Sequence, residues 1–382
     1  MPSRLALRCA VIPPAPAPYR EPLFEALAER LELRVIYQSA TQPSWDAPPT
    51  WFEPRHRYPA VHLRSRQRAR PGRTPIVWPI GLERALGDFQ PHCVVAAEYG
   101  PASLRALAWC RSHGRAYVIF TECTPEIDPL LPAAQLALHR RLARHADGLI
   151  AVSSRARRRL EQLGARAQRI GVALQSADLR PVRAARNARD AARPLPERPL
   201  IVLAVARLVA DKNLAALIQA FSAAGLAQRA ATLRILGSGP LQEELRRLAA
   251  RLGVDVQLPG ALAPEAMPEE YASAHVFACV STYEPFGVAI REACAAGLPL
   301  IVSRTAGAVD DVAREGRNAI LVDPHRPPEI ADALARLAGD AQLRRRLGEQ
   351  SRAIDRETDG RDVDAFVEVV LAAAARRRRA GG

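Results

Sequence analysis

The feature that most constrains the fold of this chain is a repeated alternation of short apolar runs with longer amphipathic stretches. Leu5–Ile12 is apolar apart from Arg8, which is typical of a buried strand, and Glu21–Leu31 carries leucines at helical spacing. The same order begins again with Leu200–Ala206 and Leu214–Phe221. Parallel strands need crossover connections, which are usually helices, so the alternation predicts α/β domains built on parallel sheets.

A stretch of different composition separates the two copies of this pattern. Residues 181–199 are rich in arginine, alanine and proline and show no periodic apolar face, so we expect a linker there. A chain of 382 residues is also long enough for two domains of about 150 residues each. We therefore expect doubly wound domains at 1–180 and 200–355 that face a cleft, followed by a C-terminal helix and basic tail at 356–382.

The charge of the chain is uneven. Its 54 basic and 40 acidic residues give a net charge of +14; residues 1–180 hold 26 basic and 15 acidic side chains, whereas residues 200–382 hold 23 of each. An anionic membrane surface, a phosphorylated substrate or another polyanion would suit the first half. Aromatic residues make up only 5% of the chain and no recognition motif occurs, so we expect no nucleic-acid partner.

The sequence indicates neither a secretion signal nor a membrane span. Leu5–Ile12 is short, is interrupted by Arg8 and is followed by several prolines, which does not fit a signal peptide. No run approaches the roughly 18 apolar residues that a membrane-spanning helix needs. The six cysteines are scattered without a C-x-x-C pair, so we expect reduced thiols. We therefore expect a cytoplasmic protein, and peripheral binding at the inner face of the membrane is a further hypothesis.

One segment of the first half is strongly basic. No acidic residue lies between Glu53 and Glu83, and aromatic side chains accompany the arginines. Two interpretations stay open: the segment contacts an anionic leaflet or a phosphate-bearing acceptor, or it is a solvated loop of an arginine-rich chain. The arginines are Arg55, Arg57, Arg64, Arg66, Arg68, Arg70 and Arg73, and the aromatic residues are Trp45, Trp51, Phe52, Tyr58 and Trp78.

Two cations stand where a strand of the second half enters a helix. Arg207 and Lys212 lie within Val205–Asn213, and cations at such a junction can bind a diphosphate together with the free N–H groups of the helix. Lys212 is the only lysine among the 54 basic residues. This indicates that a compact ammonium is required there, because a planar guanidinium differs in shape and hydration. The alternative is that drift in composition left a single lysine and that Arg207 is a solvated side chain.

A second motif, Tyr283–Cys294, combines a Pro-Gly turn with two glutamates. Gly287 opens a helix whose first N–H groups can approach a phosphate without obstruction by a Cβ atom. Glu284 in the turn and Glu292 in the helix can border one cleft, where a carboxylate can accept two hydrogen bonds from sugar or ribose hydroxyls. Taken alone, the two glutamates would be interpreted as surface residues.

In their order along the chain, these motifs resemble the donor half of glycosyltransferase family 4. The order is Arg207 with Lys212, Gly237–Pro240, Glu284 to Glu292, Gly307–Asp311 and Gly316–Asn318. The resemblance is close over about residues 200–350 and looser over 1–180, and Ala308 stands where the family usually has a second glycine. It implies a GT-B fold of two Rossmann-like domains, retaining stereochemistry, a nucleotide-diphosphate sugar as co-substrate, and no required metal or other cofactor.

The resemblance also implies roles for individual residues. Three side chains would carry catalysis: the cations Arg207 and Lys212 would bind and neutralise the departing diphosphate, and Glu284 would bind the transferred sugar. Residues 361–375 would form a helix that returns to the first domain. The remainder of the donor site would be the ribose-binding Glu292 and the backbone of Phe286, Gly287 and Val288 at the distal phosphate.

The first half departs from the family pattern. The loop at residues 13–20 lacks the glycine pair with which many members approach the donor, so Tyr19 or Arg20 is expected to fill that space. Members often carry histidines after the fourth and fifth strands, where this chain has Glu98 and Glu122. We expect Arg20, Glu98 and Glu122 on the acceptor side, where a carboxylate could bind a hydroxyl or amine. The alternative is that each glutamate caps the helix that follows it.

The sequence therefore predicts a retaining hexosyltransferase, with polysaccharide biosynthesis as one setting. It would move a sugar from a nucleotide-diphosphate sugar to a hydroxyl or amine of a saccharide, a lipid-linked glycan or a small natural product. The alternatives are another GT-B enzyme, such as a phosphorylase or a nucleotide-sugar epimerase, and a non-catalytic protein that binds nucleic acid or serves as a scaffold. The histidines show no metal-ligand spacing, so we expect no metal site.

Overall fold

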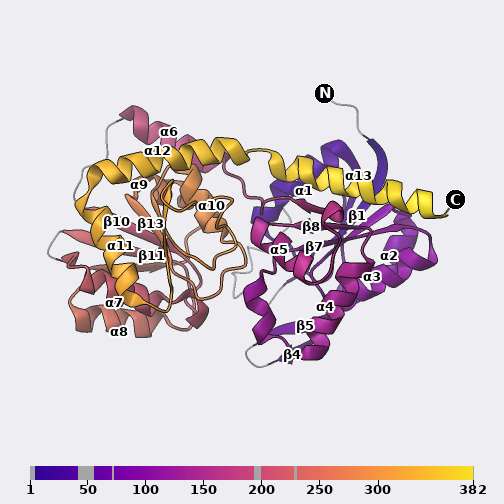
Figure 1. The fold of residues 1–382 in the computed structure, drawn as a ribbon, viewed down its shortest axis with the longest axis horizontal. Helices are drawn as coiled ribbons and strands as arrows, with labels where there is room; N and C mark the ends of the chain where they lie inside the picture. Colours follow the sequence, from indigo (N-terminus) through magenta and orange to yellow (C-terminus); the bar gives the residue numbers. More distant parts are fainter. Residues whose placement is uncertain (1–4, 42–55, 71–72, 193–198, 228–229, 382) are drawn as a thin grey trace. The chain divides into compact units, whose positions relative to one another are not determined.

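The computed structural model describes residues 5–41, 56–70, 73–192, 199–227 and 230–381. Its contacts divide the chain into two compact units: Met1–Ala177 with Gly360–Gly382 (unit 1) and Asp178–Asp359 (unit 2) (Figure 1). Each unit is an α/β domain with one main parallel sheet, as the alternation of apolar runs predicted. In the basic segment, Trp45, Trp51, Phe52 and Arg55 lie outside the described residues.

The main sheet of unit 1 has the strand order β3-β2-β1-β6-β7-β8-β9, and every neighbouring pair is parallel. Its central strands are buried throughout, which explains why they are continuous apolar runs in the sequence. The strands are β1 (Leu5–Ile12), β2 (Leu31–Tyr37), β3 (Ala60–His62), β6 (Cys93–Ala97), β7 (Ala116–Thr121), β8 (Gly148–Ala151) and β9 (Ile170–Val172).

Helices cover this sheet, and the last of them comes from the end of the chain. Helix α13 (Arg361–Gly381) packs on β7, β8 and β9 (Figure 1). A Cβ atom at Gly171 of β9 would collide with Val369 of α13, so the glycine allows close contact between helix and strand. The other helices are η1 (Pro18–Arg20), α1 (Glu21–Arg30), α2 (Leu82–Phe89), α3 (Pro101–Ser112), η4 (Pro125–Leu130), α4 (Ala133–His145), α5 (Ser154–Gln162) and η5 (Ala167–Arg169).

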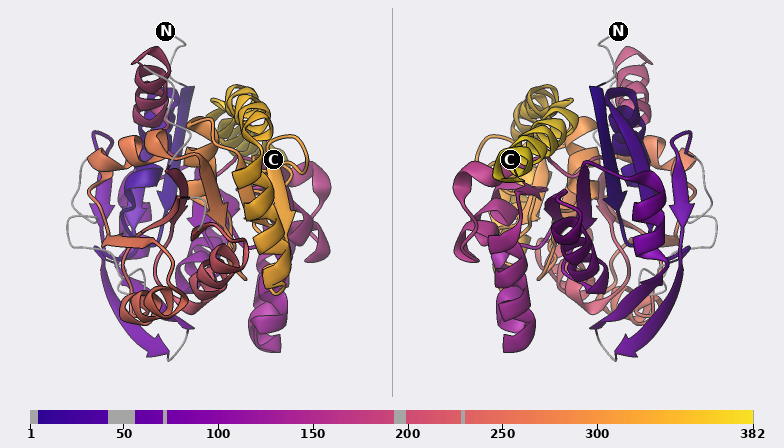
Figure 2. Two further views of the ribbon diagram at one scale, coloured as in Figure 1. Left: turned by 90° about the vertical axis from the view of Figure 1, so that its left-hand side faces the viewer. Right: turned by 90° about the vertical axis from the view of Figure 1, so that its right-hand side faces the viewer.

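The basic segment forms a separate two-stranded antiparallel sheet of β4 (Arg64–Arg70) and β5 (Arg73–Ile80). The main sheet does not include these strands, which extend away from it within unit 1 (Figure 2). The loop interpretation of this segment is therefore wrong, because two strands pair across it. The sequence did not predict these strands because β4 alternates arginine with small and polar residues and has no apolar face of its own.

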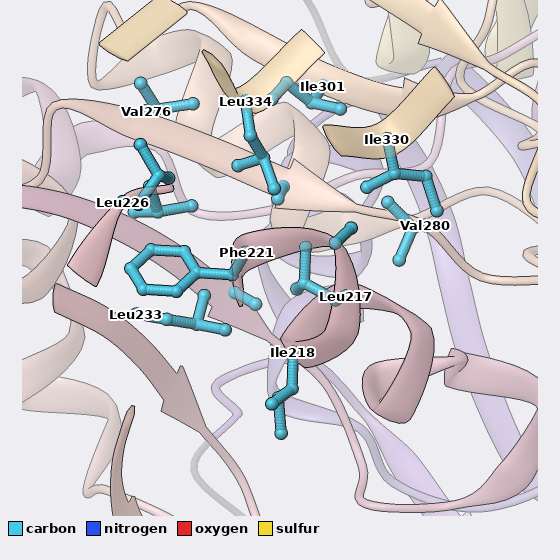
Figure 3. Packing of buried hydrophobic residues seen from close by; sticks show 14 of the residues in the cluster. Leu217, Ile218, Phe221, Leu226, Leu233, Val276, Val280, Ile301, Ile330 and Leu334 are labelled. Atoms are coloured by element: carbon cyan, nitrogen blue, oxygen red, sulfur yellow. The ribbon is translucent and has the colours of Figure 1, made fainter. Parts of the chain in front are cut away.

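The sheet of unit 2 has the order β12-β11-β10-β13-β14-β15, again with parallel neighbours. Phe221 and Leu217 of helix α7 pack with Leu233 of β11 and Val276 of β13 in its core (Figure 3). The strands are β10 (Leu200–Val205), β11 (Ala231–Leu236), β12 (Val256–Gly260), β13 (Val276–Cys279), β14 (Leu300–Ser303) and β15 (Ala319–Val322). The helices are α6 (Arg180–Ala192), η6 (Ala210–Lys212), α7 (Leu214–Ala223), α8 (Gln242–Leu252), η8 (Pro264–Ala266), α9 (Met267–Ser273), α10 (Val288–Ala295), α11 (Pro327–Gly339) and α12 (Ala341–Thr358).

The segment expected to be a linker at 181–199 is largely a helix. Residues 181–192 belong to α6, which buries Val182 and Ala185 and packs against α9. Arg183 pairs with the buried Asp355 of α12 at 2.8 Å, which neutralises part of the basic charge of this segment. The prediction failed because arginine and alanine favour helices, and a narrow apolar face of two residues has little periodic signal.

The described residues include no helix that is both long and apolar enough to cross a membrane. All six cysteines are free thiols, four of them buried, as expected from their spacing. Burial raises the pKa of the Cys294 thiol to about 12. Cys294 is therefore a packing residue in its protonated form.

Candidate functional site

The predicted donor residues lie at the carboxyl edge of the unit 2 sheet. Strand β10 has β11 on one side and β13 on the other, so successive strands are added in opposite directions from this point. Ligands of open α/β sheets bind outside the carboxyl ends of the strands at such a switch point. Lys212 follows β10 and Glu284 follows β13, which places one charged residue on each side of the switch.

Lys212 and Glu284 form a buried ion pair. The Lys212 Nζ atom donates to Glu284 Oε2 at 2.8 Å, and the two side chains are only 10% and 14% exposed. Burial alone would lower the pKa of Lys212, but the Glu284 carboxylate outweighs it and the pKa is raised. The lysine is therefore positively charged at the switch point, where Glu284 balances its charge.

Backbone hydrogen bonds join the two loops that carry this pair. The Thr282 N–H donates to the Asp211 carbonyl at 2.9 Å, and the Asn213 side-chain amide donates to the carbonyls of Val280 and Pro324 at 3.2 and 2.8 Å. Asn213 itself has a φ of 55°, a left-handed conformation that asparagine tolerates better than most residues. The Lys212 loop and the Glu284 loop are thus held at a fixed separation.

A third loop supports the turn that carries Glu284. The Gly307 N–H donates to the Glu284 carbonyl at 2.9 Å, and the Ala308 N–H donates to the Phe286 carbonyl at 3.0 Å. A Cβ atom at Gly307 would overlap the carbonyl of Pro285. The first glycine of the family's pair is therefore required by close backbone approach, whereas Ala308 accommodates its methyl group in a fully buried position.

Helix α10 begins directly after this turn. Gly287 is its N-cap with a φ of 92°, and the backbone of Val288 forms the first turn. The preceding Phe286 is buried and anchors the turn in the domain. The helix start therefore lies beside Glu284, and its free N–H groups and dipole favour an anion there.

Arg207 lies exposed in the loop after β10, at the same edge of the sheet. This loop packs on the glycine-rich turn after β11: the Leu208 N–H donates to the Ser238 carbonyl at 2.8 Å, and a Cβ atom at Gly237 would overlap the Ala206 carbonyl. The turn thus supports the Arg207 loop. Helix α8 begins at Gln242, so Pro240 belongs to the turn that precedes the helix.

Glu292 has a partner that the sequence did not indicate. The Tyr271 hydroxyl of α9 donates to Glu292 Oε2 at 2.6 Å. Burial raises the pKa of Glu292 to about 7, and the tyrosine hydrogen bond opposes part of this effect. Tyr271 lies 21 residues away on another helix, and no local pattern links it to Glu292. The tyrosine orients a carboxylate that is poised to change charge near neutral pH.

This arrangement predicts a pH-dependent stability. Between the ordinary value of 4.5 and about pH 7, folded Glu292 holds a proton that the unfolded chain has lost, so its contribution to stability falls as pH rises. Glu292→Gln removes this contribution. The free energy of unfolding of the variant minus that of wild type should therefore increase by up to roughly 3 kcal/mol as pH rises across that window. Urea denaturation at a series of pH values measures the difference. In Tyr271→Phe, the pH-dependent loss of stability should occur at higher pH than in wild type, because a hydrogen bond that lowers the pKa of Glu292 is lost.

If the stability of wild type and of Glu292→Gln changes with pH in the same way, the pKa of Glu292 is not raised.

The three acceptor-side candidates meet at the carboxyl edge of the unit 1 sheet. Arg20 follows β1, Glu98 follows β6 and Glu122 follows β7, again around the point where the strand order reverses. Arg20 Nη2 lies 3.6 Å from Glu122 Oε2, and the Glu122 N–H donates to Glu98 Oε1 at 2.8 Å. The Arg20 guanidinium is buried between the rings of Tyr19 and Phe120. Arg20 is thus held at the end of β1 beside Glu122.

The Glu98 carboxylate stabilises the structure at this edge through hydrogen bonds. Its Oε2 atom accepts from the Thr121 hydroxyl at 2.9 Å and from the Cys123 thiol at 3.2 Å, in addition to the Glu122 N–H bond at Oε1. The carboxylate therefore binds the end of β7 and does not cap α3, whose N-cap is Gly100. The Glu122 side chain is 33% exposed. In the described part of the chain, no group of three His, Cys, Asp or Glu side chains is arranged to hold a metal ion.

Comparisons with known proteins identify the class. A family model described as glycosyl transferase 4-like domain matches residues 15–175, and one described as glycosyl transferases group 1 matches residues 186–354. Two solved structures superpose over nearly the whole chain with a TM-score of 0.72 and 19% identity: HepE from Anabaena in complex with UDP and glucose (98% of this chain, 100% of that chain) and sucrose-phosphate synthase from Thermosynechococcus elongatus (98% of each). The fold is GT-B, and the chain belongs to glycosyltransferase family 4.

Two curated members of the family match parts of this chain in sequence. The α-D-kanosaminyltransferase of Streptomyces kanamyceticus is 32% identical over 159 residues, which is 41% of each chain. The GDP-mannose-dependent α-(1-6)-phosphatidylinositol monomannoside mannosyltransferase of Mycobacterium tuberculosis is 32% identical over 235 residues, which is 58% of this chain and 60% of that protein. The matched segments thus span less than two thirds of either relative.

Proposed function

We propose that the protein is a retaining hexosyltransferase that moves a sugar from a nucleotide-diphosphate sugar to an acceptor hydroxyl or amine. The observation that carries this proposal is the Lys212–Glu284 ion pair at the switch point of the donor-type domain, 2.8 Å long and nearly excluded from water. A diphosphate is the anion that fits a lysine, a helix start and a neighbouring arginine at such an edge. Solved structures with UDP or UDP-glucose and relatives named for GDP-mannose support this donor class.

In this proposal the ion pair is exchanged when the donor binds. The diphosphate takes over the Lys212 ammonium, and the released Glu284 carboxylate accepts hydrogen bonds from sugar hydroxyls. Arg207 and Lys212 then stabilise the charge that develops on the diphosphate as the anomeric C–O bond breaks. A lone-pair of the acceptor oxygen or nitrogen forms the new bond on the same face of the sugar, and its proton passes to the departing phosphate oxygen. No metal or other cofactor takes part.

Glu292 completes the donor site. Its carboxylate would accept hydrogen bonds from the ribose hydroxyls of the nucleotide, with Tyr271 fixing its orientation through the 2.6 Å hydrogen bond. Two ribose donors favour the ionised form of the carboxyl, so nucleotide binding should draw the pKa of Glu292 below its raised value of about 7. Nucleotide affinity should therefore fall as pH drops below neutral.

The acceptor is proposed to meet unit 1 at the edge that carries Arg20, Glu98 and Glu122. Glu122 would contact the acceptor hydroxyl or amine, while Arg20 and Glu98 hold it in place through the contacts described above. Relatives named for phosphatidylinositol monomannoside and for D-inositol 3-phosphate support lipid-linked or small polyol acceptors. Peripheral contact with an anionic membrane, which would suit a lipid-linked acceptor, concerns a different surface of unit 1.

Release of nucleoside diphosphate tests the reaction. We expect purified protein with its preferred nucleotide-diphosphate sugar to release nucleoside diphosphate only when an acceptor is added, and the product should keep the anomeric configuration of the donor by NMR. Conversion of the donor sugar without release of nucleotide would identify an epimerase. Consumption of inorganic phosphate with formation of a sugar phosphate would identify a phosphorylase. Either result would overturn the proposal.

A further inference from the structure

The β4–β5 hairpin presents one face that combines arginines with large apolar side chains. Directly opposite residues of an antiparallel pair share a face, and the register pairs Arg64 with Ile80 and Arg66 with Trp78. Arg68 lies opposite Ile76 one step further on. Three arginines on one strand are thus matched by three apolar residues on the other.

The opposite face of the hairpin is anchored in the domain. Val77 and Pro79 are buried, and β5 packs against helix α3. Arg105 of α3 donates to the Pro79 carbonyl, and the Gln67 amide donates to the Ser39 hydroxyl at 3.1 Å. The hairpin is therefore held in place by one face, and its arginine-bearing face is left toward solvent.

On this outer face, apolar side chains are exposed to solvent beside arginines whose charge no described carboxylate balances. Trp78 is 41% and Ile80 is 52% exposed, and both lie on this one face. Arg64, Arg66 and Arg68 are exposed, and none of them forms an ion pair with a described carboxylate. Glu83, the first acidic residue after the hairpin in the chain, is already paired with Arg105.

We propose that this basic and apolar face docks on an anionic phospholipid membrane. Arginines interleaved with tryptophan and isoleucine on a flat surface match the interfacial zone of a bilayer, where phosphates receive the cations and the apolar side chains enter the head-group boundary. A nucleic acid would gain from the arginines but leaves an exposed isoleucine at 52% without a partner. The apolar half of the face therefore favours lipid.

A pocket lies beside the hairpin and is lined by Arg64 and Ile80 of the arginine-bearing face together with Ser65 and Gln67 of the opposite face. It has a volume of about 650 Å³ and lies where β2 and β3 end. Hydroxyl, amide, imidazole and guanidinium groups line it together with one exposed isoleucine, a lining that suits the phosphate head group of a lipid from the same leaflet. The lining residues are Ser39, Ala40, His62, Leu63, Arg64, Ser65, Gln67 and Ile80.

Vesicle sedimentation with the full chain tests the proposal. We expect binding to phosphatidylcholine vesicles that contain phosphatidylglycerol, no binding to pure phosphatidylcholine, and weakening by salt. Arg66→Gln with Arg68→Gln should lower the partition coefficient by roughly 25-fold, at about fivefold for each basic residue near an anionic surface. Ile80→Ser should lower it by roughly tenfold through lost apolar contact.

Matched variants in unit 2 serve as controls. Arg251 and Arg346 are exposed arginines, and Leu252 is an exposed leucine at 38%. Arg251→Gln with Arg346→Gln, and Leu252→Ser, should bind the vesicles like wild type. The proposal would be overturned if the control variants lost as much vesicle binding as the hairpin variants. It would also be overturned if Ile80→Ser bound the vesicles as strongly as wild type. Competition in which an oligonucleotide binds through the same arginines while anionic vesicles do not bind would overturn it as well. Circular dichroism confirms that each variant is folded, and donor-induced thermal shifts, which depend on unit 2, should stay unchanged in the hairpin variants.

Discussion

Replacing Lys212 with alanine is expected to lower the rate of sugar transfer by roughly 10²–10³-fold, the usual cost of removing one preorganised group that stabilises developing charge. The lysine carries its full charge in a nearly dry position, where no water can substitute for it. A thermal-shift panel of nucleotide-diphosphate sugars provides a direct readout, because a ligand stabilises only the native state that it binds. The donor that raises the melting temperature of wild type should raise that of Lys212→Ala far less. Equal shifts would remove Lys212 from the site.

The same substitution leaves the Glu284 carboxylate buried without its cation. Such a broken pair typically costs about 3–5 kcal/mol, so Lys212→Ala is expected to be less stable than wild type even without ligand. Lys212→Met combined with Glu284→Gln removes both charges and should regain most of this stability while still failing to bind donor. Lys212→Arg keeps the charge and tests whether a compact ammonium is needed, as the single lysine of the chain suggests.

Gly307→Ala is expected to damage the donor turn as severely as a change in a charged residue. The new methyl group would overlap the Pro285 carbonyl, and either the Gly307 loop or the turn from Glu284 to Gly287 must move. Overpacking of this kind costs about 1–3 kcal/mol or more, and a displaced turn also misplaces Glu284 and the start of α10. Urea denaturation and the donor thermal shift measure the two effects separately.

Ala308→Gly is the matched control for this loop. It restores the second glycine that the family usually has, removes one buried methyl group, and should cost only about 1 kcal/mol with the donor shift retained. If Gly307→Ala keeps both wild-type stability and wild-type donor shifts, the close approach of this loop to the turn has no functional role.

The fold followed from local pattern wherever burial was complete. Strand β1 was predicted with its observed bounds, Leu5–Ile12, because it is apolar apart from Arg8 and its second half is fully buried. Helix α6 and the β4–β5 hairpin were missed for the opposite reason: arginines dominate both, and their order depends on packing against α9 and α3. Secondary structure that is stabilised by one narrow apolar contact has little periodicity for a sequence to reveal.

The candidate site was predictable as a set of residues but not as a geometry. The order of the motifs indicated that Lys212 and Glu284 belong together, yet their direct ion pair depends on strand order and on backbone bonds such as Thr282 to Asp211. Tyr271 carried no signal, since its role depends on the position of α9 beside α10. The helix-cap alternative for Glu98 was wrong because this residue adopts a left-handed backbone, φ 61°, and its side chain binds the end of β7.

The most direct test of the central claim is a crystal structure of the protein with the nucleoside diphosphate of its best donor. We predict that a diphosphate oxygen replaces Glu284 as the partner of the Lys212 ammonium, that ribose hydroxyls donate to Glu292, and that the first N–H groups of α10 point at the distal phosphate. A nucleotide bound elsewhere on the protein, with the 2.8 Å contact between Lys212 and Glu284 intact, would contradict the assignment of the donor site.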